Sequence, residues 1–219
     1  MKKQLQYFIL LFSIIFSNSV FAEFSINKTG LLINTNDGED IIIVENTGNT
    51  NILIYAEETE ETEVLSGRSL FFVSPTLSEL KPKEKQILRI LIIEDDIPDQ
   101  AIGRIRIQEI PDMENVNVKL SKSYNIPVVA HPSDLKVNNE PWKLLKVNKN
   151  KDSIILKNNS RYLIKIKPQI ICDDKNYYTV STPYINPKSQ IEIKKVKKCD
   201  KIEIEPINNS GRILEKYKI

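Results

Sequence analysis

The sequence predicts an all-β protein made of two immunoglobulin-like β-sandwich domains, the second of them reduced in size. Short apolar runs recur along the chain between Asn, Gly and Pro turns, and no helical period is sustained. The two halves also differ sharply in charge, which suggests two domains with different surfaces. A chain of 219 residues has room for a leader and two domains of about 100 residues each.

The first 22 residues have the pattern of a secretory signal peptide. Lys2 and Lys3 form a charged start, an apolar run covers residues 7–15, and residues 20–22 end at Ala22, as a cleavage site does. The apolar run is shorter than the roughly 20 residues that a membrane-spanning helix requires. We therefore expect cleavage before Glu23 rather than an uncleaved anchor, and an exported mature chain that does not insert into a membrane.

Charge divides the mature chain into an acidic half and a basic half. Residues 23–135 contain 10 Lys and Arg against 20 Asp and Glu, and residues 136–219 contain 19 against 9, so the halves carry −10 and +10. Pro132 ends an apolar run between them, and we expect domains at residues 23–132 and 136–219. Compositional drift is an alternative explanation of the contrast.

About seven strands are expected before residue 132. Residues 24–27 and 31–34 are typical of one broken edge strand, and residues 40–45 and 51–57 of a hairpin around the turn at 46–49. Further strands are expected at residues 71–73, 86–92, 103–110 and 116–132, the last two as antiparallel neighbours. The second half repeats this style at residues 142–147, 153–158, 163–171, 177–180, 190–195 and 201–205.

The segment 116–132 is longer than one sandwich requires, since most strands have five or six residues. Its first part alternates Val116, Val118 and Leu120 with polar residues, which is the period of a half-buried strand. These three side chains either fill the core of their own domain or are offered to a partner. Residues 126–129 are expected to be held in the first domain.

Two cysteines, Cys172 and Cys199, lie in an exported chain, where an even number favours a disulfide. We expect a Cys172–Cys199 bridge, which would help to stabilise a small core. Two thiols and the single histidine, His131, are too few ligands for a typical metal site, so no metal and no cofactor are expected.

Sequence motifs give no support for catalysis or nucleic-acid binding. The six glycines form no phosphate-binding loop, GxSxG and HExxH motifs are absent, and His131 lies beside Pro132 at the domain boundary. The basic residues of the second half are scattered, with no base-stacking motif. We therefore expect neither an enzyme nor a nucleic-acid-binding protein.

Several motifs in a fixed order resemble the periplasmic chaperones of the chaperone-usher pilus pathway, the PapD-like family. They are Phe71-Phe72-Val73-Ser74-Pro75, then Leu80-Lys81-Pro82 with the strand up to Ile90, then Arg104 to Pro111, and the ending Ile126 to Pro132. Together they cover about residues 24–135. The second half resembles the family in length, strand content and its cysteine pair.

The resemblance implies two immunoglobulin-like domains set at an angle, with a cleft that receives a pilus subunit lacking its last strand. Such chaperones lend a strand to the subunit and pass it to an outer-membrane usher. The resemblance thus implies a periplasmic protein whose donor strand is formed by Val116, Val118 and Leu120. Its partners would be pilus or fimbrial subunits and the usher, and it would need no ATP.

One feature of the family's best-known branch is missing. The two basic residues that bind the subunit's terminal carboxylate there correspond to Gly30 and Pro127 here, and the proline resembles the archaic or alternative branch. Candidates to replace them are Lys28, Arg104, Arg106 and Lys122. Arg104 and Arg106 are preferred because they share the strand next to the donor strand, although ordinary exposed charges are an equal alternative.

A second class of function stays open beside the chaperone: a secreted structural or adhesive protein whose long strand serves its own assembly. Genomic neighbourhood separates the two, because a chaperone gene should lie beside genes for an usher and for pilus subunits.

Overall fold

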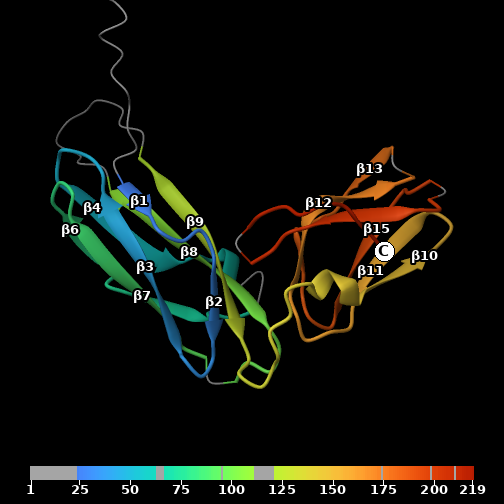
Figure 1. Ribbon diagram of the computed structural model, residues 1–219, viewed down its shortest axis with the longest axis horizontal. Helices are drawn as coiled ribbons and strands as arrows, with labels where there is room; N and C mark the ends of the chain where they lie inside the picture. The colour runs from blue at the N-terminus through green and yellow to red at the C-terminus, as the bar shows by residue number, and fades with distance from the viewer. Residues whose placement is uncertain are drawn as a thin grey trace, which may run out of the picture.

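The computed structural model describes residues 24–62, 67–94, 96–110, 121–173, 175–197, 199–209 and 211–219. These residues form strands β1 to β17 and a short 3-10 helix, so the predicted all-β class is confirmed. Figure 1 shows two lobes side by side, the first coloured blue to yellow-green and the second yellow to red. Within the described residues, no helix is both long enough and apolar enough to cross a membrane.

The first domain is a sandwich of two sheets. One sheet contains, in order, β1 (Phe24–Ile26), β3 (Glu39–Asn46), β7 (Lys85–Ile92) and β5 (Phe71–Ser74). The other contains β2 (Leu31–Asn34), β9 (Ser123–His131), β8 (Ala101–Ile110), β4 (Ile52–Glu58) and β6 (Leu77–Leu80). Alternate side chains of both sheets, such as Ile42 and Leu88 from one and Ile54 and Ile105 from the other, fill a single core.

Two predictions about this domain are wrong in the same way. Residues 24–34 do not form one edge strand, because the break near Gly30 moves the chain from the sheet of β1 to the sheet of β2. Similarly, β3 and β4 do not form a hairpin, because they lie in opposite sheets. The expected antiparallel pairing of β8 with β9 is confirmed.

Asn46 explains why the chain crosses over after β3. Its side chain is fully buried, and its amide donates hydrogen bonds to the carbonyl oxygens of Thr50, at 2.8 Å, and Leu80, at 3.0 Å. Its side-chain oxygen accepts a hydrogen bond from the backbone N–H of Gly48 at 2.9 Å. These bonds fix a turn that leads to the opposite sheet, since a buried amide must find partners.

The second domain is a smaller sandwich. One sheet contains β10 (Leu145–Lys149), β11 (Ser153–Asn158) and β15 (Ser189–Lys194). The other contains β13 (Asn176–Thr179), β12 (Ile164–Cys172), β16 (Ile202–Pro206) and β17 (Tyr217–Lys218), and β14 (Tyr184–Ile185) also pairs with β12. Trp142 was expected in a strand but lies in the 3-10 helix Pro141–Leu144, because Pro141 favours a helical start. Its side chain still packs into the core.

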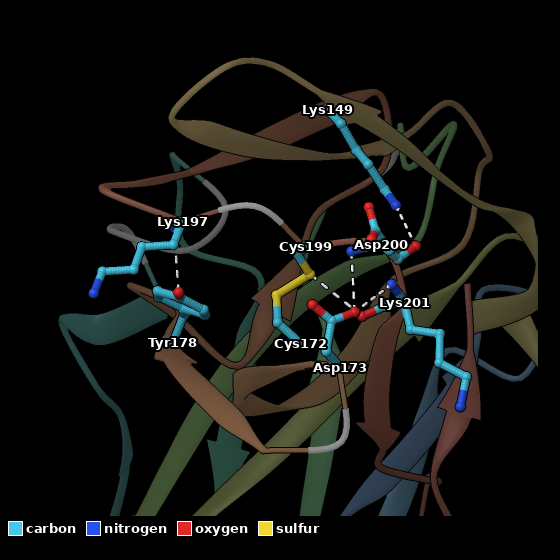
Figure 2. Close-up of a disulfide and its surroundings, with 8 residues drawn as sticks. All are labelled: Lys149, Cys172, Asp173, Tyr178, Lys197, Cys199, Asp200 and Lys201. Carbon is cyan, nitrogen blue, oxygen red and sulfur yellow. Dashed lines mark hydrogen bonds between the residues drawn. A yellow bond between two sulfur atoms is a disulfide. The ribbon is translucent and has the colours of Figure 1, made fainter.

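The predicted disulfide between Cys172 and Cys199 is present, with a Cα–Cα distance of 5.3 Å. It ties the end of β12 to the segment that precedes β16 (Figure 2). Beside it, the Asp173 carboxylate accepts hydrogen bonds from the backbone N–H groups of Asp200, at 3.0 Å, and Lys201, at 2.8 Å. The disulfide and this carboxylate therefore hold the same two segments together.

Candidate functional site

Strand β9 has an open edge over its first half. It pairs with β8 along its length, from Ser123 opposite Gln108 to Ala130 opposite Ala101, whereas β2 pairs in parallel with residues 128–131 only. Within the described part of the chain, no strand pairs with residues 123–127 on the side away from β8. Unpaired backbone groups along such an edge form a template for another strand.

The predicted donor residues Val116, Val118 and Leu120 lie outside the described residues. They precede the open edge directly along the chain, since β9 begins at Ser123. The part predicted to belong to the first domain does so, because Ile126 and Val128 are buried in its core. That residues 116–120 form a free part of the long segment stays a prediction.

Gly30 and Pro127, which stand where the best-known branch of the resembled family has basic residues, lie next to each other. A Cβ atom built at Gly30 would be 3.7 Å from the Cγ atom of Pro127 and 3.1 Å from the carbonyl oxygen of Asn209 in the second domain. The second distance is shorter than an ordinary contact, so a longer side chain at position 30 would press against the second domain. This close approach explains why glycine suits the position.

Arg104 reaches from the first domain to the second. It lies opposite Pro127 on the neighbouring strand, and its Nε atom is 3.1 Å from the Glu61 carboxylate. Its Nη2 atom donates a hydrogen bond to the Tyr184 hydroxyl at 2.6 Å, with the guanidinium 5.6 Å from the ring centroid. Burial raises the pKa of Tyr184, and the charge of Arg104 opposes this shift.

Arg106, two residues further along β8, lies among acidic side chains. Its Nη2 atom is 3.1 Å from the Glu57 carboxylate, while its Nε atom is buried with no hydrogen-bond partner among the described residues. Its side chain lines a pocket of about 300 Å³ together with Thr59, Glu60, Glu61 and Asn125. The spare donor could serve an anion, but the neighbouring carboxylates weaken attraction for a negative charge.

Lys122 and Lys28 have partners within the first domain. The Lys122 ammonium donates to the carbonyl oxygen of Phe24 at 2.9 Å and lies 4.6 Å from the centroid of the Tyr124 ring. The Lys28 ammonium is 2.7 Å from the Asp40 carboxylate. Of the four candidates, Arg104 is the one whose contacts among the described residues reach the second domain.

Gln100 joins the two domains through a chain of hydrogen bonds. Its backbone N–H donates to the carbonyl of Arg161 at 3.0 Å, and its side-chain oxygen accepts from the N–H of Leu163 at 2.8 Å. Its amide nitrogen lies 2.8 Å from Nδ1 of His131, whose Nε2 atom lies 2.8 Å from the carbonyl of Leu135. Both ring nitrogens of the buried histidine thus have structural partners.

Arg161 forms a second tie between the domains. Its guanidinium makes two hydrogen bonds to the Asp134 carboxylate, at 2.8 and 2.9 Å, and also bonds the carbonyl of Pro98 at 2.9 Å. The Asp99 carboxylate lies 3.3 Å from its Nε atom. The hydrogen bond from Arg161 lowers the pKa of Asp134 and raises that of Arg161 itself. This bidentate geometry is specific to arginine and fixes a relative orientation.

A small apolar cluster completes the junction. Ile102, Val129 and Leu163 are buried in it, with Leu32 and Tyr184 packed against them. Sequence reasoning missed Tyr184, Gln100 and Arg161. Each belongs to an ordinary polar or alternating stretch, and its partners are far away in the chain, so no local pattern marks it.

Among the described residues, no group of three or more His, Cys, Asp or Glu side chains is placed to hold a metal ion. What the residues bring together is a strand edge, a junction between two domains, and basic side chains near both. Such a combination can pair with an extended polypeptide and hold charged groups beside it.

Comparison with known proteins reveals the relatives of this chain. Residues 23–136 match the family model of pili and flagellar-assembly chaperones, PapD N-terminal domain. An uncharacterized fimbrial chaperone of Escherichia coli K12, YhcA, is 28% identical over 144 residues, which are 64% of this chain and 63% of that relative.

Solved structures extend the likeness to both domains. The E. coli chaperone DraB aligns with a TM-score of 0.71 at 18% identity, covering 90% of this chain and 96% of that chain. A chain in the complex of the Salmonella enterica SafA pilin with the SafB chaperone gives 0.75 at 16% identity, covering 92% and 97%. A chain of the archaic CsuC–CsuE complex of Acinetobacter baumannii gives 0.60 at 19% identity, covering 90% and 97%. At these identities the likeness establishes the two-domain fold.

Proposed function

Because the chain belongs to the family of pili and flagellar-assembly chaperones, we propose that it stabilises pilus or fimbrial subunits in the periplasm by lending them a strand. It then delivers the subunits to an outer-membrane usher. The family consists of chaperones, and the described residues contain no group of three or more His, Cys, Asp or Glu side chains that could hold a metal ion.

The open edge of β9 carries this proposal. Among the described residues, a strand pairs with residues 123–127 on one side only, and the chain that precedes them alternates Val116, Val118 and Leu120 with polar residues. A subunit that lacks a strand could pair its backbone with this segment while its groove takes up the three apolar side chains. Each such side chain, when fully buried, contributes about 1.5 to 3 kcal/mol.

Similar proteins support the same partner. Two of the structural relatives are complexes, one of a chaperone with the SafA pilin and one of a chaperone with a tip adhesion subunit of archaic Csu pili. We extend this partner class to the present chain. We also propose that the mature protein begins at Glu23, with domains at residues 23–132 and 136–219.

The basic residues around the junction are proposed to receive the subunit's terminus. Arg104 is favoured among the four candidates because it lies opposite Pro127 and reaches Tyr184 of the second domain. Its charge is, however, already compensated by Glu61, as that of Arg106 is by Glu57.

Co-expression with a fimbrial subunit tests the proposal. The subunit encoded beside the chaperone gene should accumulate in soluble, undegraded form with the wild-type chaperone. It should be lost when Val116, Val118 and Leu120 are all changed to Asp, because charged side chains cannot enter an apolar groove. The matched control changes the intervening polar residues Asn117 and Lys119 to Ser, which should leave the yield of subunit unchanged.

An equal yield of soluble subunit with the triple variant and the wild type would refute strand donation. The rival function, a structural or adhesive protein, predicts instead that the chain assembles with itself. Size-exclusion chromatography of the mature protein alone would then show large assemblies rather than a defined small species.

A further inference from the structure

Lys165 is a buried lysine on strand β12 of the second domain. Its neighbours Ile164 and Ile166 are completely buried in the core of that domain. Because successive side chains of a strand point to opposite faces, Lys165 points away from this core. It is nevertheless only 8% exposed, so something other than its own domain's core must cover it.

The residues around Lys165 belong to the junction between the domains. On one side, its strand partner is Tyr184, the residue whose hydroxyl is hydrogen-bonded to Arg104 of the first domain. On the other side, the carbonyl of Lys165 accepts a hydrogen bond from the N–H of Ile207 at 2.8 Å. Two residues later, the carbonyl of Asn209 approaches Gly30 of the first domain. Lys165 therefore lies on the face of the second domain that is turned toward the first.

The ammonium group of Lys165 has no anionic partner among the described residues. Lys167, on the same strand, shows the contrast, because its ammonium is 3.0 Å from the Glu205 carboxylate. A buried charge without a partner is costly, since water no longer solvates it. Burial alone lowers the pKa of Lys165 to about 8, with no neighbouring charge contributing.

We propose that Lys165 is an anion-binding residue of this chaperone, and that its ammonium receives the terminal carboxylate of the bound subunit from the side of the second domain. This inference rests on the proposed function and deepens it. Arg104 and Arg106 of the first domain are compensated by the carboxylates of Glu61 and Glu57, and Gly30 and Pro127 carry no charge. Lys165 is a buried cation at the junction with no carboxylate partner among the described residues, and a carboxylate is the ligand that would satisfy it.

A pair of synthetic peptides tests the proposal with the full-length mature chaperone. Both carry the C-terminal strand of the fimbrial subunit encoded beside the chaperone gene, one with a free carboxylate and one with a C-terminal amide. The wild-type chaperone should bind the free acid about tenfold more tightly than the amide, as expected for one charge-assisted hydrogen bond. In Lys165→Met and Lys165→Gln the two peptides should bind equally, because the cation is gone.

Lys167→Met is the matched control. It removes a lysine two residues away on the same strand, whose charge is already paired, and should keep the full preference for the free acid. A persistent preference in both Lys165 variants, or equal binding of the two peptides to the wild type, overturns the role of Lys165 while strand donation stands. Failure of the wild type to bind either peptide or the intact subunit overturns the proposed function itself.

Thermal unfolding of the free chaperone separates binding from support of the fold. Removing an uncompensated buried charge should raise the melting temperature in Lys165→Met, whereas a lysine that supported the fold would lower it on removal. A lower melting temperature in both Lys165 variants, together with an equal loss of binding to both peptides, would assign the residue a structural role instead.

Discussion

The two domains turn the chain between their sheets with the same device but secure the rest of the fold differently. Asn46 ends β3 in the first domain and Asn158 ends β11 in the second, and both are fully buried. Each amide donates to the carbonyl of the residue four positions later, Thr50 in one case and Tyr162 in the other. The same local chemistry therefore directs the crossover twice.

The difference lies in what surrounds this device. In the second domain the amide of Asn158 has two further acceptors, the carbonyls of Ile185 and Asn186, and a disulfide ties two neighbouring segments. The first domain contains no cysteine and has one large core, and no described strand pairs with the first half of β9 on the side away from β8. The comparison teaches that the first domain, which contains the β9 edge, is stabilised by its core. The second domain is stabilised by its disulfide and by the hydrogen bonds of Asn158.

Loss of the disulfide should give the largest effect and separate the domains most clearly. Changing both Cys172 and Cys199 to Ser should lower the free energy of unfolding of the second domain by about 3.5 kcal/mol, because the closed loop is 27 residues long. Urea unfolding followed by NMR should show this loss in the second domain and little change in the first. Equal destabilisation of both domains would mean that they fold as one unit.

Alkaline pH should stabilise the chain through Lys165, by an amount of up to about 3 kcal/mol. The pKa is about 8 in the fold, against the ordinary lysine value of 10.5, so the unfolded chain binds more protons between these values. The penalty for burying the ammonium is complete below pH 8 and disappears as the pH rises toward 10.5.

Urea unfolding of the wild type and of Lys165→Met at a series of pH values measures this contribution. The difference in stability between the two proteins should shrink across the window. A difference that stays constant from pH 7 to pH 10.5 would contradict the burial of an unpaired ammonium.

Replacing each buried asparagine tests whether Asn46 and Asn158 contribute equally to stability. Asn158→Ala should cost about 2 kcal/mol, because it leaves buried carbonyl groups without donors. Asn46→Ala should cost somewhat less, since its amide serves two carbonyls rather than three. Chemical unfolding of the two variants measures both losses of stability. The reverse order would show that the number of carbonyl acceptors does not determine the loss.

A surface ion pair should give the smallest effect. Arg89 and Glu39 pair across β7 and β3, but their side chains are 56% and 34% exposed to solvent. Arg89→Ala should therefore change the stability of the first domain by about 0.5 kcal/mol or less. Its urea midpoint should lie close to the wild-type value, and a loss comparable to that of Asn46→Ala would show that the pair is structural.

Local patterns predicted the strands well but not their partners. Alternation located most strands within a few residues, because the period of two is a local property. It could not show that β3 and β4 belong to opposite sheets, since Asn46 decides this through the carbonyl of Leu80, which lies 34 residues later. In the same way, Pro141 moved Trp142 out of the expected strand without changing its burial.

The candidate site was harder to predict than the fold. Lys165 and Lys167 occupy the same alternating pattern, yet Lys165 is buried while the Lys167 side chain is 39% exposed. The absence of basic residues at positions 30 and 127 was visible in the sequence, but the buried cation of the second domain, Lys165, was not. Contacts between domains join residues distant in the chain, so they leave no local pattern.

Hydrogen exchange along β9 tests most directly whether this strand is the edge that receives a subunit. In the free chaperone, β8 and β2 should protect the amides of residues 128–131, whereas among residues 123–126 the amides that point away from β8 should exchange fast. Addition of the subunit should slow exchange at residues 123–126 and in the preceding segment. Unchanged exchange there, with protection appearing elsewhere in the chain, would contradict strand donation.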